Sequence, residues 1–351
     1  MKIQIDKKVI GESSETFIIA ELSANHNQDI EIALKSIDSI KQCGADAVKL
    51  QTYTPDTITL DCDNDYFKIK HGTIWDGTTL YELYKKAYTP WEWQPKLKKY
   101  AEDLGLICFS SPFDKTAVDF LAKMNVAAYK IASFEIVDIP LIEYTAAQGK
   151  PIIISTGIAT EDEIADAVDV CRKVGNNQIA LLKCTSEYPA PIEETNLKTI
   201  PYLTNKFGVV AGLSDHTLEA TASIAAVAVG AKIIEKHFIL DKSIGGPDSS
   251  FSLEPTQFAQ MVKAIRSVEK ALGNSEMAVT ERMKNSRRFA RSLFAVKDIQ
   301  AGEILTEDNV RSIRPAGGLP PKYFSRILGS KAINKIPRGN PITFNDIEPS
   351  E

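Results

Sequence analysis

The sequence has few cysteines and histidines and lacks long apolar runs. Its 351 residues include five cysteines and four histidines. The cysteine number is odd and no CxxC pair occurs, which argues against a disulfide framework or a structural zinc site and favours a reduced, cytoplasmic interior. The start, Met1–Glu15, is polar, and the most apolar stretch, Ala220–Ile234, is short and interrupted. We therefore expect neither a secretory signal nor a membrane span.

A strong excess of either charge sign is also missing. The chain has 41 basic and 46 acidic residues, a net charge of −5. Such a mildly acidic chain is poorly suited to binding nucleic acid or an anionic lipid surface. With 44% hydrophobic and 25% charged residues, the composition is that of a globular protein. The length fits two domains, or one large barrel with a small module.

Short apolar runs alternate with segments of helical spacing. Most of the runs are continuously hydrophobic, as strands of a parallel sheet are when both faces are buried. The eight runs are Phe17–Leu22, Ala47–Tyr53, Leu106–Pro112, Ala128–Ser133, Ile152–Gly157, Ile179–Ser186, Val209–Thr217 and Ile233–Phe238. Their number and spacing predict an α/β fold, a (β/α)8 TIM barrel. The alternative, an open doubly wound sheet, would normally carry a glycine-rich fingerprint after the first run, and none follows Glu21.

Local signals refine this layout. Capping boxes at Thr89–Glu92 and Thr160–Glu163 predict helix starts. Tyr53–Thr78 is too long for a simple connection, and we interpret it as a loop over one barrel mouth. After Leu272 the sequence turns polar and basic, then rich in short β-like runs and Gly/Pro turns. We predict a barrel domain over residues 1–275, a linker over 276–292 and a small β-rich domain over 293–351.

The active site of such a barrel lies at the carboxyl ends of its strands. Lys49, Lys130 and Lys183 each occur there inside an apolar run. A buried charge is costly unless it is compensated. The lysines therefore pair with acids such as Glu21, Glu135 or Glu235, or they bind a phosphate or carboxylate together with serine and threonine hydroxyls. A Schiff-base lysine is a third possibility.

Two histidines end the seventh and eighth runs, His216 in SDHT and His237 in EKHF. Neighbouring parallel strands lie about 4.8 Å apart, so two imidazoles at the same height are able to grip one divalent cation such as Mn²⁺. The alternative is a pair of hydrogen-bonded barrel residues. Asp248, in a turn after the eighth run, is expected near the same mouth. The tryptophans Trp75, Trp91 and Trp93 are expected to pack in the core or a lid.

Motifs along the whole chain resemble the sialic acid synthase family, whose members join phosphoenolpyruvate to an amino sugar. These motifs are AELSANHNQD, VKLQTY, SSPFD, YKIAS, ISTG, KCTSEYPAP, GLSDHT, IEKHF and GGPDSSFSLEP. The tail, with RSLFAVKDIQAGE, VRSIRPAGGLPP and IPRGNPI, resembles that family's antifreeze-like (SAF) domain. The resemblance implies a metal-dependent transferase that forms a carbon–carbon bond.

Within the family the sequence is most similar to the pseudaminic acid synthase branch. It has TTLYELYKKAYTPWEWQPKL before SSPFD, reads KIASFE where N-acetylneuraminate synthases read KIGSGE, and has Ser249 after GPD, where those enzymes often have histidine. The resemblance thus implies 2,4-diacetamido-2,4,6-trideoxy-L-altrose as the sugar. An N-acetylneuraminate or legionaminate synthase is the alternative. A Schiff-base aldolase, or an ice- or carbohydrate-binding protein, is a more distant one.

The resemblance also implies roles for single residues. His216 and His237 match metal ligands for Mn²⁺ or Mg²⁺, and Glu21 matches a residue near the reacting sugar that is suited to proton transfer. Tyr188 and Asp248 also match residues near that sugar. The residues that match the phosphoenolpyruvate pocket are Lys49, Lys130, Ser133, Ser155, Lys183, Thr185 and Ser214. Arg314 matches an arginine that the SAF domain inserts into a partner's barrel, which implies a domain-swapped homodimer.

Overall fold

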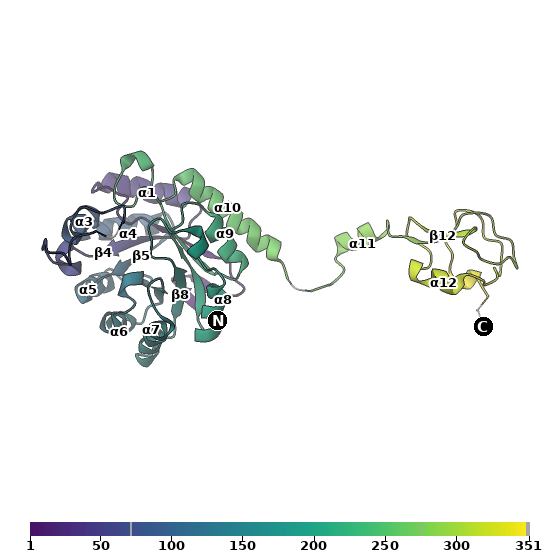
Figure 1. The fold of residues 1–351 in the computed structure, drawn as a ribbon, viewed down its shortest axis with the longest axis horizontal. Coiled ribbons are helices and arrows are strands. Elements are labelled where there is room, and N and C mark those ends of the chain that lie inside the picture. Colours follow the sequence, from purple (N-terminus) through teal and green to yellow (C-terminus); the bar gives the residue numbers. More distant parts are fainter. Residues whose placement is uncertain (71, 275, 349–351) are drawn as a thin grey trace. The chain divides into compact units, whose positions relative to one another are not determined.

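The computed structural model describes residues 1–70, 72–274 and 276–348, and the chain forms two compact units, Met1–Gly273 and Asn274–Glu351. The predicted boundary at residue 275 and the last three residues lie outside the described part. The first unit contains a closed barrel of parallel strands with helices around it (Figure 1). The second unit is small and has short strands and many turns.

Each of the eight apolar runs forms a barrel strand, which confirms the predicted fold. One strand ends at its predicted residue, Pro112, and the others stop one or two residues before the predicted ends. They are β3 (Phe17–Glu21), β4 (Ala47–Thr52), β5 (Ile107–Pro112), β6 (Tyr129–Ile131), β7 (Ile152–Ser155), β8 (Ile179–Cys184), β9 (Val210–Asp215) and β10 (Ile233–His237). The barrel closes where β10 pairs with β3, from Ile233 opposite Phe17 to His237 opposite Glu21.

Helices follow the strands and cover the outside of the barrel. They are α1 (Ile30–Gln42), α2 (Pro55–Ile58), α3 (Leu80–Ala87), α4 (Gln94–Asp103), α5 (Lys115–Lys123), α6 (Ile139–Ala146), α7 (Glu161–Lys173), α8 (Thr199–Phe207), α9 (Thr221–Ala228) and α10 (Pro255–Leu272). The capping box at Thr160 is present and starts α7. The box predicted at Thr89 does not form, because the Thr89 hydroxyl bonds the His26 ring, but a 3-10 turn over Trp91–Trp93 begins there and leads into α4 at Gln94.

A hairpin that the sequence reading missed precedes the barrel. Strands β1 (Lys2–Ile5) and β2 (Lys8–Gly11) pair antiparallel. Ile3, Ile5 and Ile10 are buried in one cluster with barrel residues such as Phe17 and Ile233. Because these barrel residues lie at the amino ends of their strands, the hairpin closes that end of the barrel. The other end remains for the site.

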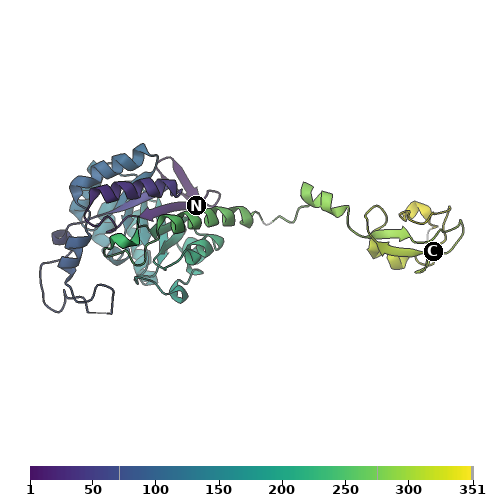
Figure 2. The ribbon, with the colours of Figure 1, turned by 90° about the horizontal axis from the view of Figure 1, so that it is seen from above.

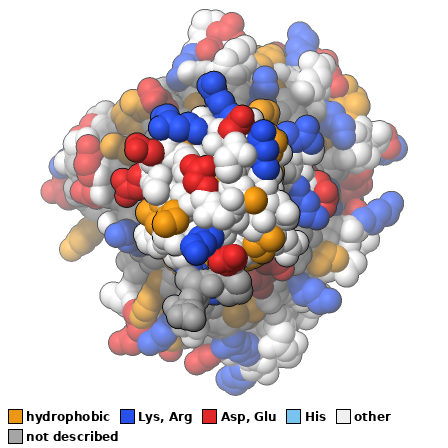
Figure 3. Space-filling model, turned by 90° about the vertical axis from the view of Figure 1, so that its right-hand side faces the viewer, with side chains coloured by type: hydrophobic (Ala, Val, Ile, Leu, Met, Phe, Trp, Pro, Cys, Tyr) orange, Lys and Arg blue, Asp and Glu red, His pale blue; other side chains and the backbone are white. Residues whose placement is uncertain are grey.

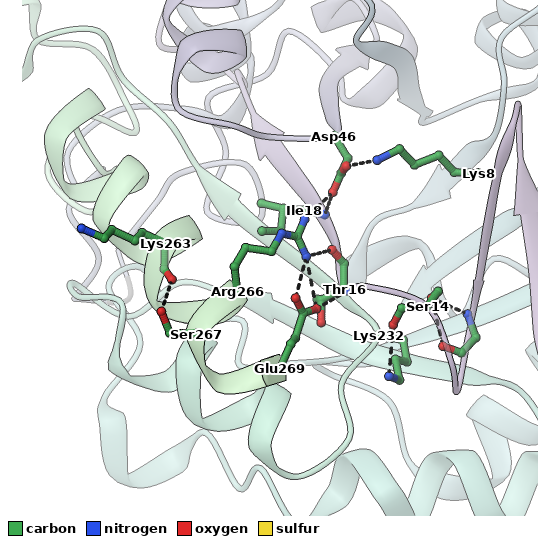
Figure 4. Close-up of polar contacts among 11 residues, drawn as sticks. Lys8, Ser14, Thr16, Ile18, Asp46, Lys232, Lys263, Arg266, Ser267 and Glu269 are labelled. Carbon is green, nitrogen blue, oxygen red and sulfur yellow. Dashed lines mark hydrogen bonds and ion pairs between the residues drawn. The ribbon is translucent and has the colours of Figure 1, made fainter. Parts of the chain in front are cut away.

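The amino end of the barrel also carries a polar network (Figure 4). Arg266 of α10 donates to Asp46, to Glu269 and to the Thr16 carbonyl at 2.9–3.2 Å. Asp46, just before β4, also accepts the Ile18 N–H at 2.9 Å and pairs with Lys8. The network joins α10 to the first two barrel strands far from their carboxyl ends.

The carboxy-terminal unit has its own core. It contains α11 (Glu281–Arg287), the antiparallel pair β11 (Ser292–Ala295) and β12 (Val310–Ile313), and α12 (Phe324–Ile327), which lie in the green-to-yellow part of Figure 2. Leu293, Ile299, Leu305, Ile327 and Ile342 are buried together. Helix α11 lies within the segment predicted as a linker, and its residues are exposed.

All five cysteines are free thiols. In the described part of the chain, no helix combines the length and the apolarity that crossing a bilayer requires. Acidic and basic side chains are interspersed over the face drawn in Figure 3.

Candidate active site

The candidate site is built from side chains that point into the barrel at its carboxyl end. His237 lies opposite Glu21, and Glu21 opposite Lys49, in the strand register. Side chains alternate along a strand, so Glu235 faces the same way as His237, two residues further on. Lys130 enters from β6, where it is opposite the buried Ile153. Strands far apart in the sequence thus deliver charged groups to one interior.

Four of these groups form a buried ion-pair network. The Lys49 Nζ lies 2.8 Å from Glu21 Oε2 and 3.4 Å from Glu235 Oε1. The Lys130 Nζ lies 3.4 Å from the same Glu235 oxygen. All four side chains are at most 4% exposed. Two of the three lysines are therefore paired with acids, and they converge on one point where an anion would meet both.

The two carboxylates of this network have opposite proton affinities. Burial raises the pKa of Glu21 to about 7, although the positive charge of Lys49 opposes the rise. Burial acts on Glu235 too, but Lys130 and Lys49 together lower its pKa to about 2. Glu235 is thus a permanent anion, whereas Glu21 exchanges a proton near neutral pH. Burial lowers the pKa of Lys130.

Hydroxyl groups line the wall from β6 to β9. Ser214 donates to Glu235 Oε1 at 3.0 Å, and the Ser133 and Ser186 hydroxyls are 2.6 Å apart. The Ser155 hydroxyl is buried and has no hydrogen-bond partner. A Cβ on Gly157 would lie 2.1 Å from Ser186 Oγ and 2.5 Å from Ser133 Oγ. The wall therefore offers donors, and a side chain at position 157 would require two of these hydroxyls to shift.

The two predicted histidines lie beside each other at the barrel mouth, with ring centroids 5.4 Å apart. The His216 Nδ1 lies 2.9 Å from the Thr185 carbonyl, so it carries the proton of the neutral ring and leaves Nε2 as the free lone pair. The His237 Nδ1 is buried without a hydrogen bond, 3.8 Å from Asp248 Oδ2. Burial lowers the pKa of His237 well below its ordinary value, so its ring is neutral. Burial disfavours the charged form of His216 as well, but the neighbouring Cys184 and the Thr185 carbonyl raise the pKa of His216 above its ordinary value. The His237 ring is therefore in the form that binds a metal, and a metal on His216 would compete with a proton.

An aromatic wall stands over the histidines. The Tyr188 ring lies 4.3 Å from that of His216, and the Trp75 ring lies 5.6 Å from Tyr188. Trp75 also donates its indole N–H to the Pro247 carbonyl at 3.0 Å. Trp75 belongs to the long connection after β4, and this contact joins it to the turn that holds Asp248. The connection thus reaches over the mouth, as the sequence predicted.

The polar residues after β3 have structural partners. The Asn25 amide donates to the Phe238 carbonyl at 2.8 Å and to Ser252 Oγ at 2.7 Å. The His26 ring lies 3.0 Å from the Thr89 hydroxyl, and burial lowers its pKa to about 4. Both side chains hold loops together.

Three predicted residues lie elsewhere. Lys183 lines a separate cavity of about 580 Å³ with Thr156, Glu193 and Lys198, between the starts of α7 and α8. It is therefore apart from Lys49 and Lys130, contrary to the expectation that all three grip one anion. The Thr185 hydroxyl donates to the Glu194 carbonyl at 3.1 Å, and only the backbone of Thr185 reaches His216. Arg314 belongs to the second unit, where it is exposed.

Three residues of the site were not predicted as site residues from the sequence. Glu235 is the centre of the ion-pair network, and its position two residues before His237 would have placed it inside the barrel. Ser186 and Glu135 follow strand ends, and the conformation of such loops is the part of a fold that a sequence predicts least well. Burial raises the pKa of Glu135 to about 7, and Lys130 and Lys49 act on it electrostatically. Glu135 is thus a second carboxyl group that exchanges a proton near neutral pH.

The chain is similar to several known proteins in sequence and in fold. Residues 36–277 match the NeuB family and residues 290–348 the SAF domain. A pseudaminic acid synthase of Helicobacter pylori is 51% identical over 95% of this chain and 98% of its own. An N,N'-diacetyllegionaminic acid synthase of Legionella pneumophila is 34% identical over 96% of both chains. The crystal structure of a Leptospira borgpetersenii N-acetylneuraminic acid synthetase in complex with citrate superposes with a TM-score of 0.73 at 30% identity, covering 82% of this chain and 95% of that one.

Proposed function

Because the chain belongs to the NeuB family, we propose that it is a pseudaminic acid synthase. It condenses phosphoenolpyruvate with 2,4-diacetamido-2,4,6-trideoxy-L-altrose and releases phosphate. The observation that carries the proposal is the convergence of two buried lysines, an orphaned serine hydroxyl and two neighbouring histidines at one barrel mouth. Identities of 49–51% to three pseudaminic acid synthases favour this sugar over that of the legionaminate synthases, at 34–37%.

Phosphoenolpyruvate would bind against Lys49 and Lys130. Its phosphate and carboxylate require several positive charges and donors in a site that excludes water. The lysines supply the charge, and Ser133, Ser155 and Ser214 supply hydroxyls. Protonation of Glu21 removes one of the two negative charges that neutralise the lysines in the free protein. The pocket then carries a net positive charge for the incoming anion.

The histidines fit a divalent metal. The His216 Nε2 is free, and His237 Nδ1 is a buried nitrogen without a partner. Among the described residues, no three His, Cys, Asp or Glu side chains are placed to hold a metal together, so water or substrate oxygens would complete its coordination. Such an ion acts as a Lewis acid that polarises a carbonyl oxygen. Two nitrogen ligands with oxygens suit Mn²⁺, and Mg²⁺ is the other candidate.

The reaction makes one carbon–carbon bond and breaks one carbon–oxygen bond. Carbon 3 of phosphoenolpyruvate attacks the sugar aldehyde, and the aldehyde oxygen takes up a proton. Water then adds at carbon 2, gives up a proton, and phosphate leaves. Glu21 and Glu135 each have a pKa of about 7, so they are the groups that accept and supply these protons. The lysines stabilise the phosphate as it departs.

The sugar would lie above phosphoenolpyruvate, between Tyr188 and Asp248, and Arg314 of a second subunit would contact it. Support for a homodimer comes from the loops around the mouth, which expose large apolar side chains. These are Phe134, Val137, Ile158, Ile192 and Leu218, each 45–56% exposed. An apolar rim of this kind is typical of a surface that a partner covers.

Phosphate release with three sugars tests the proposal. We expect rapid release with the diacetamido-trideoxy-altrose and Mn²⁺, and much slower release with N-acetylmannosamine or the legionaminate precursor. A faster rate with either of those sugars would assign the chain to another branch. His237→Ala should remove most of the activity, as should a chelator. Borohydride trapping of substrate on Lys130 would instead identify a Schiff-base aldolase.

A further inference from the structure

Two charged side chains lie directly behind the histidines and take no part in the chemistry above. Asp215 precedes His216 and Lys236 precedes His237, and their Cα atoms are partners across β9 and β10. Because side chains alternate along a strand, both point away from the barrel interior that Ser214 and Glu235 face. They are nevertheless buried, with 2% and 0% exposure. A buried pair of this kind needs complete hydrogen bonding to be tolerated.

Lys236 meets this requirement with oxygens from the loop that follows His216. Its Nζ lies 3.1 Å from Asp215 Oδ2 and donates to the Glu219 carbonyl at 3.0 Å. It also donates to the Thr217 carbonyl. One ammonium group thus holds the backbone on the far side of His216 at two points.

Asp215 holds the same loop from its other side. It accepts the Thr217 N–H at 2.9 Å and the Thr217 hydroxyl at 2.7 Å through Oδ1. Its Oδ2 accepts the Ser223 hydroxyl of α9 at 2.6 Å. Thr217 is thereby fixed through its N–H, hydroxyl and carbonyl, and the loop is tied to α9.

The consequence for the site is geometric. His216 stands between Asp215 and Thr217, and His237 follows Lys236 without an intervening residue. The backbone positions of both imidazoles therefore depend on one ion pair, while the Thr185 carbonyl orients only the His216 ring. Metal ligands require support of this kind to be held within a fraction of an ångström.

We propose that Asp215 and Lys236 are positioning residues, which hold His216 and His237 at the separation that binds a divalent metal. The proposal rests on the metal site assigned under the proposed function. The metal site then requires, besides the two histidines, a charge pair on the opposite face of the same two strands.

Calorimetric titration of the metal-free full-length protein with Mn²⁺ tests this proposal without relying on turnover. The variant is Asp215→Asn/Lys236→Met, which removes both charges and keeps similar volumes. We expect its dissociation constant for Mn²⁺ to rise about 10- to 100-fold, the usual effect of removing an outer-shell partner. Its circular dichroism spectrum should stay that of the wild type. A folded variant that binds Mn²⁺ as tightly as the wild type would overturn the proposal.

Arg266→Met is the matched control. It breaks a partly buried ion-pair network in the same unit, at the amino end of the barrel (Figure 4). We expect it to lower the thermal midpoint while leaving the Mn²⁺ dissociation constant within about twofold of the wild-type value, because the ligands are remote. If Arg266→Met weakens Mn²⁺ binding as much as the double variant does, general destabilisation explains both effects and the proposal fails.

Two further variants keep the test decisive. If the double variant does not fold, Ser223→Ala removes a single hydrogen bond to Asp215, and we expect about threefold to tenfold weaker Mn²⁺ binding from the loss of roughly one hydrogen bond. An unchanged constant in Ser223→Ala would then overturn the proposal. His237→Ala separates the two levels of inference: if it binds Mn²⁺ like the wild type, the metal site itself is wrong. If it loses Mn²⁺ while the double variant retains it, only the positioning role is wrong.

Discussion

Gly157 shows how closely the site is packed around single atoms. It ends the ISTG motif, and any Cβ there would overlap the hydroxyls of Ser186 and Ser133. Both hydroxyls belong to the wall that we assign to phosphoenolpyruvate. Glycine is thus required at this position by the close approach of two other strands' loops, and not by its own backbone angles.

Gly157→Ala should therefore raise the KM for phosphoenolpyruvate. Forcing a methyl group into this wall costs about 1–3 kcal/mol, which corresponds to roughly 5- to 150-fold. Steady-state kinetics with each substrate varied in turn measures the effect. The double variant Gly157→Ala/Ser186→Ala removes the worst overlap and should recover part of the loss. A wild-type KM in the single variant would show that this wall does not contact phosphoenolpyruvate.

Glu135 links the site to the pH dependence of stability. Its folded-state pKa is about 7 and its ordinary value is 4.5, because burial disfavours the carboxylate. Below pH 4.5 both states are protonated, so there is no penalty. As the pH rises from 4.5 to 7 the unfolded chain loses its proton first, and the folded state becomes less stable.

Replacing Glu135 with glutamine should remove this penalty. The free energy of unfolding of Glu135→Gln relative to wild type should increase between pH 5 and pH 8, by at most about 3 kcal/mol. Urea unfolding followed by tryptophan fluorescence reports on the barrel, which contains all three tryptophans. Glu163→Gln is the control, since capping bonds from Thr160 lower the pKa of Glu163. Both the folded and the unfolded state are then ionised above pH 5, so the difference for Glu163→Gln should stay constant between pH 5 and pH 8. A difference that does not change with pH would contradict the raised pKa of Glu135.

Among the elements, the connection between β4 and α3 is the one placed to control access of substrate to the barrel mouth. It is much longer than the other strand–helix connections, and it places Trp75 on Tyr188 and on the turn that carries Asp248. Long loops of this kind are commonly binding loops or lids. Its position at the outer edge of the mouth puts it near the sugar and away from Lys49 and Lys130.

Trp75→Ala should raise the KM for the sugar about 10-fold and leave the KM for phosphoenolpyruvate nearly unchanged. The estimate combines the loss of one hydrogen bond with the loss of one aromatic contact. Trp75→Phe keeps a ring over Tyr188 and should lie between Trp75→Ala and the wild type. Equal changes in the two KM values would mean that the loop supports the whole site and does not select the sugar.

At the scale of the whole molecule, the proposed exchange of SAF domains assigns each active site to two chains. Arg314 is exposed on the second unit. Losing a charge-assisted hydrogen bond from Arg314 to an acetamido oxygen should cost about 1.5–3 kcal/mol, or roughly 10- to 100-fold in kcat/KM.

Mixing two impaired proteins tests the exchange. After joint refolding, Arg314→Ala and His237→Ala chains form mixed dimers in which one site has both defects and the other has neither. Activity should then reappear. If each SAF domain serves its own barrel, every site keeps one defect and mixing restores nothing. Wild-type kinetics of Arg314→Ala alone would remove Arg314 from the site.

Much of the barrel was determined by the sequence alone. Strands buried on both faces must be apolar throughout, so eight runs such as IIIS and IALL identified eight strands without any contact information. Polar residues where those runs end identified Glu21, Lys49, Lys130, His216 and His237, because a parallel barrel brings all carboxyl ends to one mouth. The hairpin β1–β2 was missed because its short, half-exposed strands have no such signal.

Only the tertiary structure decided which of the polar residues meet. Lys183 and Lys130 look alike in sequence, yet Lys183 has the orientation of the outward-facing Leu181, and Lys130 that of the inward-facing Ile153. A shift of one residue reverses the face that a side chain occupies, and the sequence leaves that one-residue register open. The pairing of Lys49 with Glu21 and Glu235, and of Lys236 with Asp215, joins residues from different strands. Such pairings depend on the strand order and stagger of the closed barrel, which exist only once the chain has folded.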